Sequence, residues 1–208
     1  MQSSVQTIQM SVKTIQASVI DITRDAPTSK DELFVDTNSW RNLTYSRIRN
    51  PKPEYLGYLK QALANGTTLY ACGVTLIELA SSIEVDEMEI FKASAPHVTN
   101  KKIFRHEYPE ERKKVVAEVK ASWGQVTQIA RLVDLNLNSG ALERCVKTFD
   151  SCPVDGYDLL LIEAMERRNV LNILTDDSDF AGVLGVKVFT ANAAVLAGAR
   201  RQNKLLLR

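Results

Sequence analysis

The sequence has few of the residues that build disulfide frameworks or zinc sites. It contains three cysteines and two histidines among 208 residues, and no C-x-x-C pair. An odd, scattered set of cysteines argues against both kinds of site, so we expect free thiols in a reducing compartment. The two histidines stand apart from other ligand types, and we expect surface or structural roles for them.

Other absences narrow the class of protein further. No run of eighteen apolar residues occurs, which argues against a membrane-spanning helix. The N-terminus lacks a basic segment followed by an apolar one, so no secretory signal is indicated. We therefore expect a cytoplasmic protein with no membrane partner. A Gly-rich phosphate-binding loop, a Ser-His-Asp set and a Cys-His pair are also missing, which removes several enzyme classes.

Neither sign of charge dominates, because the sequence has 26 basic and 25 acidic residues and a net charge of +1. The distribution is uneven, with basic residues concentrated in 41–52, 101–120 and 200–208 and acids in 155–179. A near-neutral net charge is compatible with a basic surface around an acidic pocket. Candidates for contacting nucleic-acid phosphates are Lys101, Lys102, Arg105, Lys113 and Lys114; the alternative is a solvated helix face.

The length suggests one domain with an appendage. Residues 1–31 are rich in Gln, Ser, Thr and Val and repeat short phrases. Three interpretations of this segment stay open: a strand, a docking arm and a disordered tail. We favour a flexible or partner-docking extension. The globular domain is then expected over 32–208.

Strand and helix patterns alternate through that domain. Leu33–Val35 predicts a buried strand that ends at Asp36. Residues 53–64 predict a helix with proline in its first turn, and 67–71 a strand. A Thr75–Glu78 capping-box spacing predicts a helix that begins at Thr75. Residues 84–128 predict further helix, with a charged helical insert around 95–125.

The second half of the sequence continues the alternation. We expect a short edge strand in 132–137, helices over 141–149 and 157–168, strands over 170–175 and 186–189, and a final helix over 193–207. This order predicts an α/β fold with three layers, α/β/α, around a mainly parallel sheet.

Four acids from distant segments are expected to meet in such a fold. Asp36 and Asp177 follow strands, while Glu78 and Asp158 stand near helix starts, and ligands bind at the carboxyl ends of parallel strands. Close carboxylates repel by several kcal/mol at an effective dielectric near 20, so a compensating cation is expected. Oxygen ligands select Mg²⁺ or Mn²⁺, and such ions promote phosphodiester cleavage.

Neighbouring polar residues have supporting roles or plainer alternatives. Asp179 is a further candidate ligand, through water, and Asp176 is expected to be solvated. Asn38 is expected to orient Asp36. Asp155 is expected either to cap its helix or to stand behind Asp158. Asp36 could be a simple turn residue, and Glu78 could merely cap its own helix.

Four motifs together resemble the PIN-domain nuclease family. They are Phe34-Val-Asp36-Thr-Asn38, Thr75-Leu-Ile-Glu78-Leu-Ala, Asp158-Leu-Leu-Leu-Ile-Glu-Ala-Met and Leu174-Thr-Asp-Asp177-Ser-Asp179-Phe. The likeness covers roughly residues 33–83 and 130–192. It implies a PIN fold, Mg²⁺- or Mn²⁺-dependent cleavage of RNA, and dimerisation. Compact members include VapC-like toxins, which implies an antitoxin as a partner. The 1–31 segment and the helical insert depart from those toxins.

Two other functions stay open beside a ribonuclease. One is a non-catalytic PIN-like module that binds RNA or a protein. The other is a structure-specific DNA nuclease.

Overall fold

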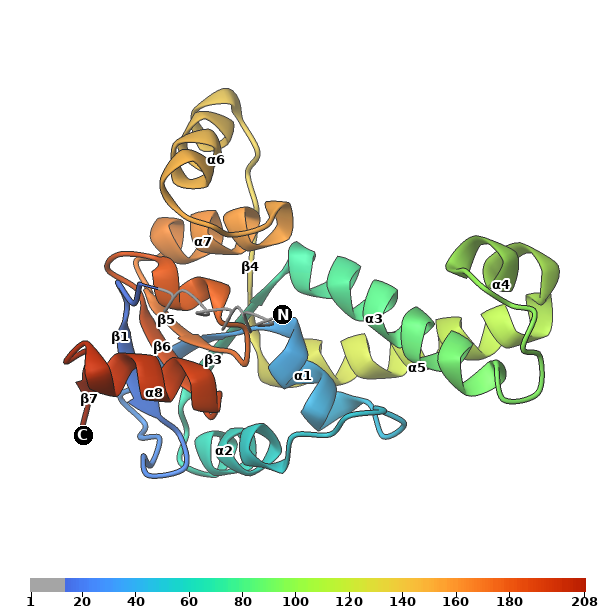
Figure 1. Ribbon diagram of the computed structural model, residues 1–208, viewed down its shortest axis with the longest axis horizontal. Coiled ribbons are helices and arrows are strands. Elements are labelled where there is room, and N and C mark those ends of the chain that lie inside the picture. Colours follow the sequence, from blue (N-terminus) through green and yellow to red (C-terminus); the bar gives the residue numbers. More distant parts are fainter. Residues whose placement is uncertain (1–13) are drawn as a thin grey trace, which may run out of the picture.

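A seven-stranded sheet covered by helices on both faces forms the centre of the computed structural model, which describes residues 14–208 (Figure 1). The strand order is β4-β3-β2-β5-β6-β1-β7, and every pairing recorded within this range is parallel. The strands are β1 (Ser18–Asp21), β2 (Glu32–Val35), β3 (Thr68–Cys72), β4 (Arg131–Val133), β5 (Asn172–Leu174), β6 (Lys187–Thr190) and β7 (Leu205–Leu206). The predicted α/β/α class is confirmed.

Helices connect most of the strands, whereas β1 leads to β2 without a helix and β5 leads to β6 through a 3₁₀ turn. They are α1 (Thr37–Thr44), α2 (Pro53–Ala64), α3 (Gly73–Phe91), α4 (Lys101–Glu107), α5 (Pro109–Ile129), α6 (Ser139–Ser151), α7 (Gly156–Arg168) and α8 (Ala193–Arg201), with a 3₁₀ turn, η1, at Asp179–Gly182. The edge strand expected within 132–137 is β4, which begins one residue earlier.

The two faces of the sheet carry separate apolar cores. Neighbouring residues of a strand point to opposite faces, and Val35 packs with α1, α2, α3 and α5 while Phe34 packs with α7. Trp40 of α1 is fully buried in the first core. Helix α8 packs on β1.

The long helices α3 and α5 lie side by side and carry α4 away from the sheet (Figure 1). Their far end has a small core of its own, which includes Met88, Phe104 and Val115. Buried Glu84 of α3 pairs there with Arg105 and Arg112. The arm is therefore held by packing and charge pairing of its own.

Two expectations about the ends of the chain are wrong. Residues 18–21 form β1, which lies between β6 and β7, so an extension up to residue 31 is excluded for the described part. Val19 and Ile20 are buried within the sheet; residues 1–13 lie outside the described range. The final helix ends at Arg201, because Asn203 adopts a left-handed backbone, and the chain returns as β7.

Candidate active site

Asp36 stands where β2 ends and caps the N-terminus of α1. Its Oδ1 accepts a hydrogen bond from the backbone N–H of Thr37 at 2.6 Å. Its Oδ2 accepts from the hydroxyl of Thr175 at 2.6 Å and from the side-chain amide of Asn38. The carboxylate is buried, so these contacts fix its orientation at the carboxyl edge of the sheet. The side-chain amide of Asn38 thus contacts the carboxylate of Asp36 directly.

Glu78 does not cap its own helix. Helix α3 begins at Gly73, two residues before the expected Thr75, and its N-cap is Cys72. The Oε2 of Glu78 instead accepts a hydrogen bond from the hydroxyl of Thr37 at 2.6 Å. Glu78 is thereby tied to the residue that follows Asp36.

Asp155 and Asp158 share the first turn of α7. Asp155 is the N-cap, and its Oδ1 accepts from the backbone N–H groups of Tyr157 at 2.8 Å and Asp158 at 3.0 Å. The Oδ2 of Asp158 accepts from the backbone N–H of Asp155 at 3.3 Å. This reciprocal capping box leaves the second oxygen of Asp158 available, although its side chain is buried.

The loop after β5 brings two further acids to the same place. The backbone N–H of Asp177 donates to the hydroxyl of Thr175 at 2.9 Å, and that of Asp179 donates to Oδ1 of Asp177 at 2.8 Å. One carboxylate oxygen each from Asp158, Asp177 and Asp179 lies within 4.8 Å of the others. The hydroxyl of Thr175 touches both Asp36 and this loop, a link that the sequence motifs did not indicate.

The predicted acids line one cavity of about 300 Å³. Its acidic lining is Asp36, Glu78, Asp155, Asp158 and Asp177. Within residues 14–208, no lysine or arginine forms an ion pair with Asp36, Glu78, Asp158 or Asp177. The acids thus converge without a cationic partner from this part of the chain.

The surroundings make negative charge costly in the cavity. Burial, with the Glu78 and Asp177 charges, raises the pKa of Asp36 to about 7 against the hydrogen bond from Thr175. Burial, with Asp155, Asp36 and Asp177, raises the pKa of Asp158 to about 8. The pKa of Glu78 is also raised, first by burial. Desolvation and like charge act in the same direction here.

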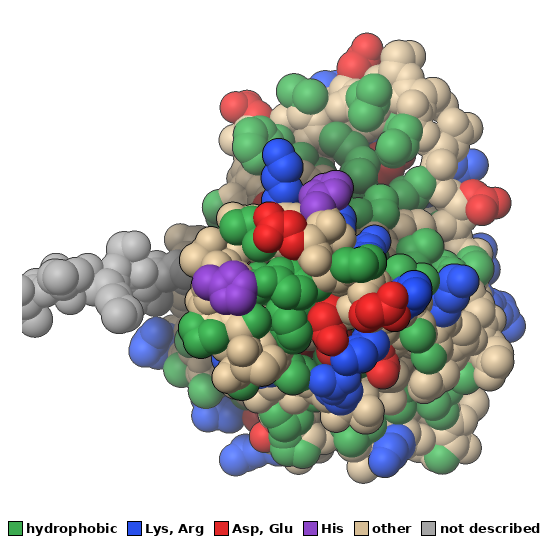
Figure 2. Space-filling model, turned by 90° about the vertical axis from the view of Figure 1, so that its right-hand side faces the viewer, with side chains coloured by type: hydrophobic (Ala, Val, Ile, Leu, Met, Phe, Trp, Pro, Cys, Tyr) green, Lys and Arg blue, Asp and Glu red, His purple; other side chains and the backbone are tan. Residues whose placement is uncertain are grey.

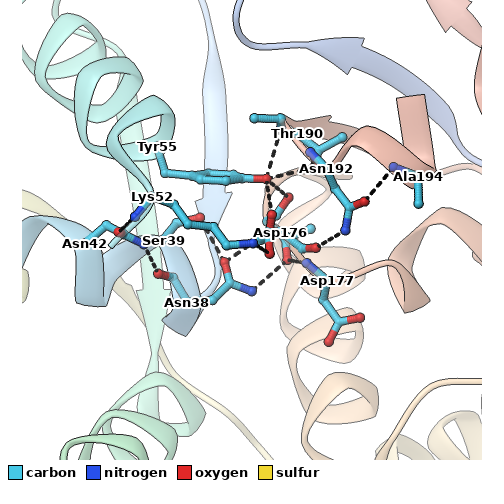
Figure 3. Close-up of polar contacts among 12 residues, drawn as sticks. Asn38, Ser39, Asn42, Lys52, Tyr55, Asp176, Asp177, Thr190, Asn192 and Ala194 are labelled. Carbon is cyan, nitrogen blue, oxygen red and sulfur yellow. Dashed lines mark hydrogen bonds and ion pairs between the residues drawn. The ribbon is translucent and has the colours of Figure 1, made fainter. Parts of the chain in front are cut away.

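Asp176 is not the solvated residue that we expected. Its carboxylate pairs with Lys52 and accepts from the hydroxyl of Tyr55 at 3.0 Å (Figure 3). The side chain of Asn192 donates to the backbone carbonyl of Asp176 at 2.8 Å, and the backbone N–H of Asp176 donates to Oδ1 of Asn38 at 3.1 Å. These contacts anchor the loop on the side away from Asp177.

Tyr55 is the centre of that anchor. Its hydroxyl also accepts from the backbone N–H of Ala191 at 2.9 Å and lies 2.9 Å from the hydroxyl of Thr190. Helix α2, the end of β6 and the acidic loop therefore meet at one buried oxygen (Figure 3). A tyrosine inside an amphipathic helix gives no signal of this in the sequence.

The five basic candidates on the arm do not form one free cationic patch. Lys113 and Lys114 pair with Glu110 and Glu111 at 2.7 Å, and Arg105 pairs with Glu84. Figure 2 shows acidic, basic and apolar side chains mixed on this face, with both histidines exposed. Lys102 is exposed, whereas Lys101 reaches back to α3, where its ammonium donates to the hydroxyl of Ser81 at 3.0 Å.

The donor set fits a hard divalent cation. Carboxylate oxygens are the ligands that Mg²⁺ and Mn²⁺ prefer, and opposite ligands of an octahedral Mg²⁺ lie about 4.2 Å apart at bond lengths near 2.1 Å. The oxygens of Asp158, Asp177 and Asp179 lie within 4.8 Å of one another, which is close enough for one such cation to bind among them. Among the described residues, no histidine or cysteine joins this group to favour zinc.

Comparison with known proteins adds little beyond these residues. No protein-family model matches the sequence, and no curated protein matches it. Among solved structures, a similar chain comes from the crystal structure of VapBC2 from Rickettsia felis bound to a DNA fragment from their promoter. The identity is 13% and the TM-score 0.47, with 76% of this chain and 96% of that chain covered.

Proposed function

We propose that the chain is a Mg²⁺- or Mn²⁺-dependent ribonuclease of the PIN type, which hydrolyses RNA phosphodiester bonds with an activated water. The observation that supports this is the convergence of Asp36, Glu78, Asp158 and Asp177 on one cavity with no cationic partner from residues 14–208. A fold that buries acids normally pairs them. A divalent cation is the partner that this arrangement suits.

Asp158, Asp177 and Asp179 would hold the cation. Asp36 and Glu78 line the cavity together with Asp158 and Asp177. The bound ion would lower the pKa of an attacking water and offset negative charge on the leaving oxygen. The hydroxyls of Thr37 and Thr175 keep the Glu78 and Asp36 carboxylates in place. Because several of these acids have raised pKa values, protons must leave as the cation binds, and its affinity should rise with pH.

RNA as the substrate, an antitoxin partner and a homodimer rest on the motif resemblance, and they stay predictions. Within residues 14–208, no helix is long and apolar enough to span a bilayer.

The test compares cleavage of single-stranded RNA, single-stranded DNA and flap DNA in Mn²⁺, Mg²⁺ and EDTA. The wild type should cut RNA only with a divalent cation. Asp36→Asn and Asp177→Asn should each lower the rate by about a hundredfold or more, since each removes an oxygen ligand or its charge. Asp150→Asn, an exposed acid on α6, is the matched control and should cleave normally.

Each alternative has its own outcome in the same experiment. Unchanged cleavage in both site variants would exclude this cavity as the active site. Absence of cation binding by calorimetry would favour a non-catalytic module. Preferential cutting of flap DNA would favour a structure-specific DNA nuclease.

A further inference from the structure

The cavity of the proposed ribonuclease continues past the carboxylates along one face of α3. Glu78, Ser81, Ser82 and Val85 all line it, and their spacing of three, four and seven residues places them on one helix face. The volume of about 300 Å³ equals that of about ten liquid waters. It exceeds what a hydrated ion needs, so the cavity has room for part of a substrate.

Arg41 of α1 is the one cationic residue that lines this cavity within the described chain. It pairs with Asp86 on α3 through Nη2, and not with the acids of the site. Its Nε is buried with no hydrogen-bond partner. A guanidinium has five N–H donors, so the bond to Asp86 fixes the orientation of the Arg41 guanidinium and leaves its other N–H donors available.

Tyr157 supplies an aromatic ring to the same cavity. It is 48% exposed, and it stands directly before Asp158 in the first turn of α7. Its backbone N–H is held by the Asp155 cap at 2.8 Å, so the position of the residue is fixed while the ring stays accessible. Exposed aromatic rings beside nucleic-acid sites stack on unpaired bases.

Lys101 provides a second positive charge at this end of the cavity. Its ammonium donates to Ser81, which lines the cavity, at 3.0 Å. Cationic groups therefore stand at Arg41 and beside Ser81, along the α3 face that leads away from the acids.

We propose that Arg41 and Tyr157 form a subsite for one unpaired nucleotide next to the bond that is cut. Arg41 contacts its phosphate, and Tyr157 stacks on its base. This rests on the proposed function and makes it more specific: a base that stacks on Tyr157 must lie outside a duplex, so the site takes single-stranded or looped RNA.

The Arg41 contact is tested by RNA cleavage kinetics at several KCl concentrations. Arg41→Ala is combined with Asp86→Asn, because Asp86 is buried and would otherwise lose its partner. The double variant should lower kcat/KM about tenfold or more, and the slope of log KM against log salt should fall by about 0.7. Arg47→Ala combined with Glu87→Gln is the matched control: Arg47 pairs with the next residue of α3, the buried Glu87, at 3.0 Å, and neither residue lines the cavity.

The Tyr157 contact is tested with ring variants and an altered substrate. Tyr157→Ala should weaken RNA binding roughly 5- to 100-fold, and Tyr157→Phe should keep it. A substrate with one abasic nucleotide beside the cut should bind the wild type and Tyr157→Ala equally. Phe149→Ala, which removes an exposed ring of α6 outside the cavity, should bind normally.

The outcomes separate the two proposals. Cleavage by the wild type with normal kinetics in the Arg41 and Tyr157 variants would overturn the subsite and leave the nuclease in place. No cleavage by the wild type, with or without these changes, would count against the nuclease itself. Equal cutting of base-paired and unpaired RNA would also overturn the subsite.

Discussion

Two groups of fully or partly buried carboxylates in this molecule have opposite surroundings. Asp25 and Asp31 share the guanidinium of Arg208, which donates to Asp25 at 2.9 and 2.6 Å and to Asp31 at 2.5 Å. Burial is the largest single influence and raises their pKa values, but the hydrogen bonds and charge of Arg208, together with hydrogen bonds from Tyr58 to Asp25 and from Thr28 to Asp31, lower both pKa values overall. In the cavity at Asp36 and Asp158, burial and like charge raise the pKa instead.

This contrast indicates which group of acids forms a functional site. Other buried acids of the fold have basic partners. Glu163 pairs with Arg144, and Glu84 pairs with Arg105 and Arg112. Within residues 14–208, the same fold supplies no lysine or arginine partner to the four predicted ligands at the carboxyl edge of the sheet. Unrelieved repulsion costs stability, which fits a site that retains charge for a ligand.

The largest expected difference comes from Arg208→Ala. It strips both Asp25 and Asp31 of their partner, and we expect a loss of about 2 kcal/mol in the free energy of unfolding at pH 7, discounted for partial exposure. The lowered pKa values mean that this contribution is complete above the unfolded value of 3.8 and fades as the pH falls through the folded values.

Urea unfolding of the wild type and Arg208→Ala at pH 7, 5 and 3 measures this effect. The gap between the two proteins should be widest at pH 7 and narrow toward pH 3. A variant as stable as the wild type at pH 7 would break the comparison, since the paired group would then contribute nothing.

A substitution that neutralises an acid of the cavity should change the free energy of unfolding in the opposite direction and stabilise the fold. In EDTA at pH 7, Asp158→Asn should stabilise the fold by roughly 1–2 kcal/mol. The folded protein must either protonate Asp158, whose pKa is about 8, or keep its crowded charge, and asparagine requires neither. Millimolar Mn²⁺ should raise the melting temperature of the wild type but not of this variant, since a ligand that binds only the native state stabilises it. Destabilisation in EDTA would mean that the acids are not under repulsion.

The smallest and sharpest contrast uses two tyrosines of α2. Tyr55 donates to Asp176 beside the cavity at 3.0 Å, and Tyr58 donates to Asp25 in the paired group at 2.6 Å. Phenylalanine at either place should cost about 1 kcal/mol, the net worth of a typical hydrogen bond. Only Tyr55→Phe should also lower kcat, by about tenfold, because its hydroxyl anchors the loop that carries Asp177 and Asp179. Equal activity in both variants would show that this loop needs no such anchor.

The alternation of elements and the positions of the acids in them could be predicted from the sequence alone. Apolar runs that end in aspartate predicted β2 and β5, and both strands end within a residue of the expected place. Parallel topology then required Asp36 and Asp177 to share an edge, because the carboxyl ends of parallel strands meet there. That physical rule is local enough to be applied without coordinates.

Tertiary structure alone decided the role of residues 14–31, the end of the last helix and the neighbours of the acids. β1 is short and follows a polar stretch, and its membership of the sheet depends on pairing with strands more than 160 positions away. The hydroxyls of Thr37, Thr175 and Tyr55 meet their acidic partners only through contacts between distant segments. Such contacts follow from packing, and no periodicity in a single sequence encodes them.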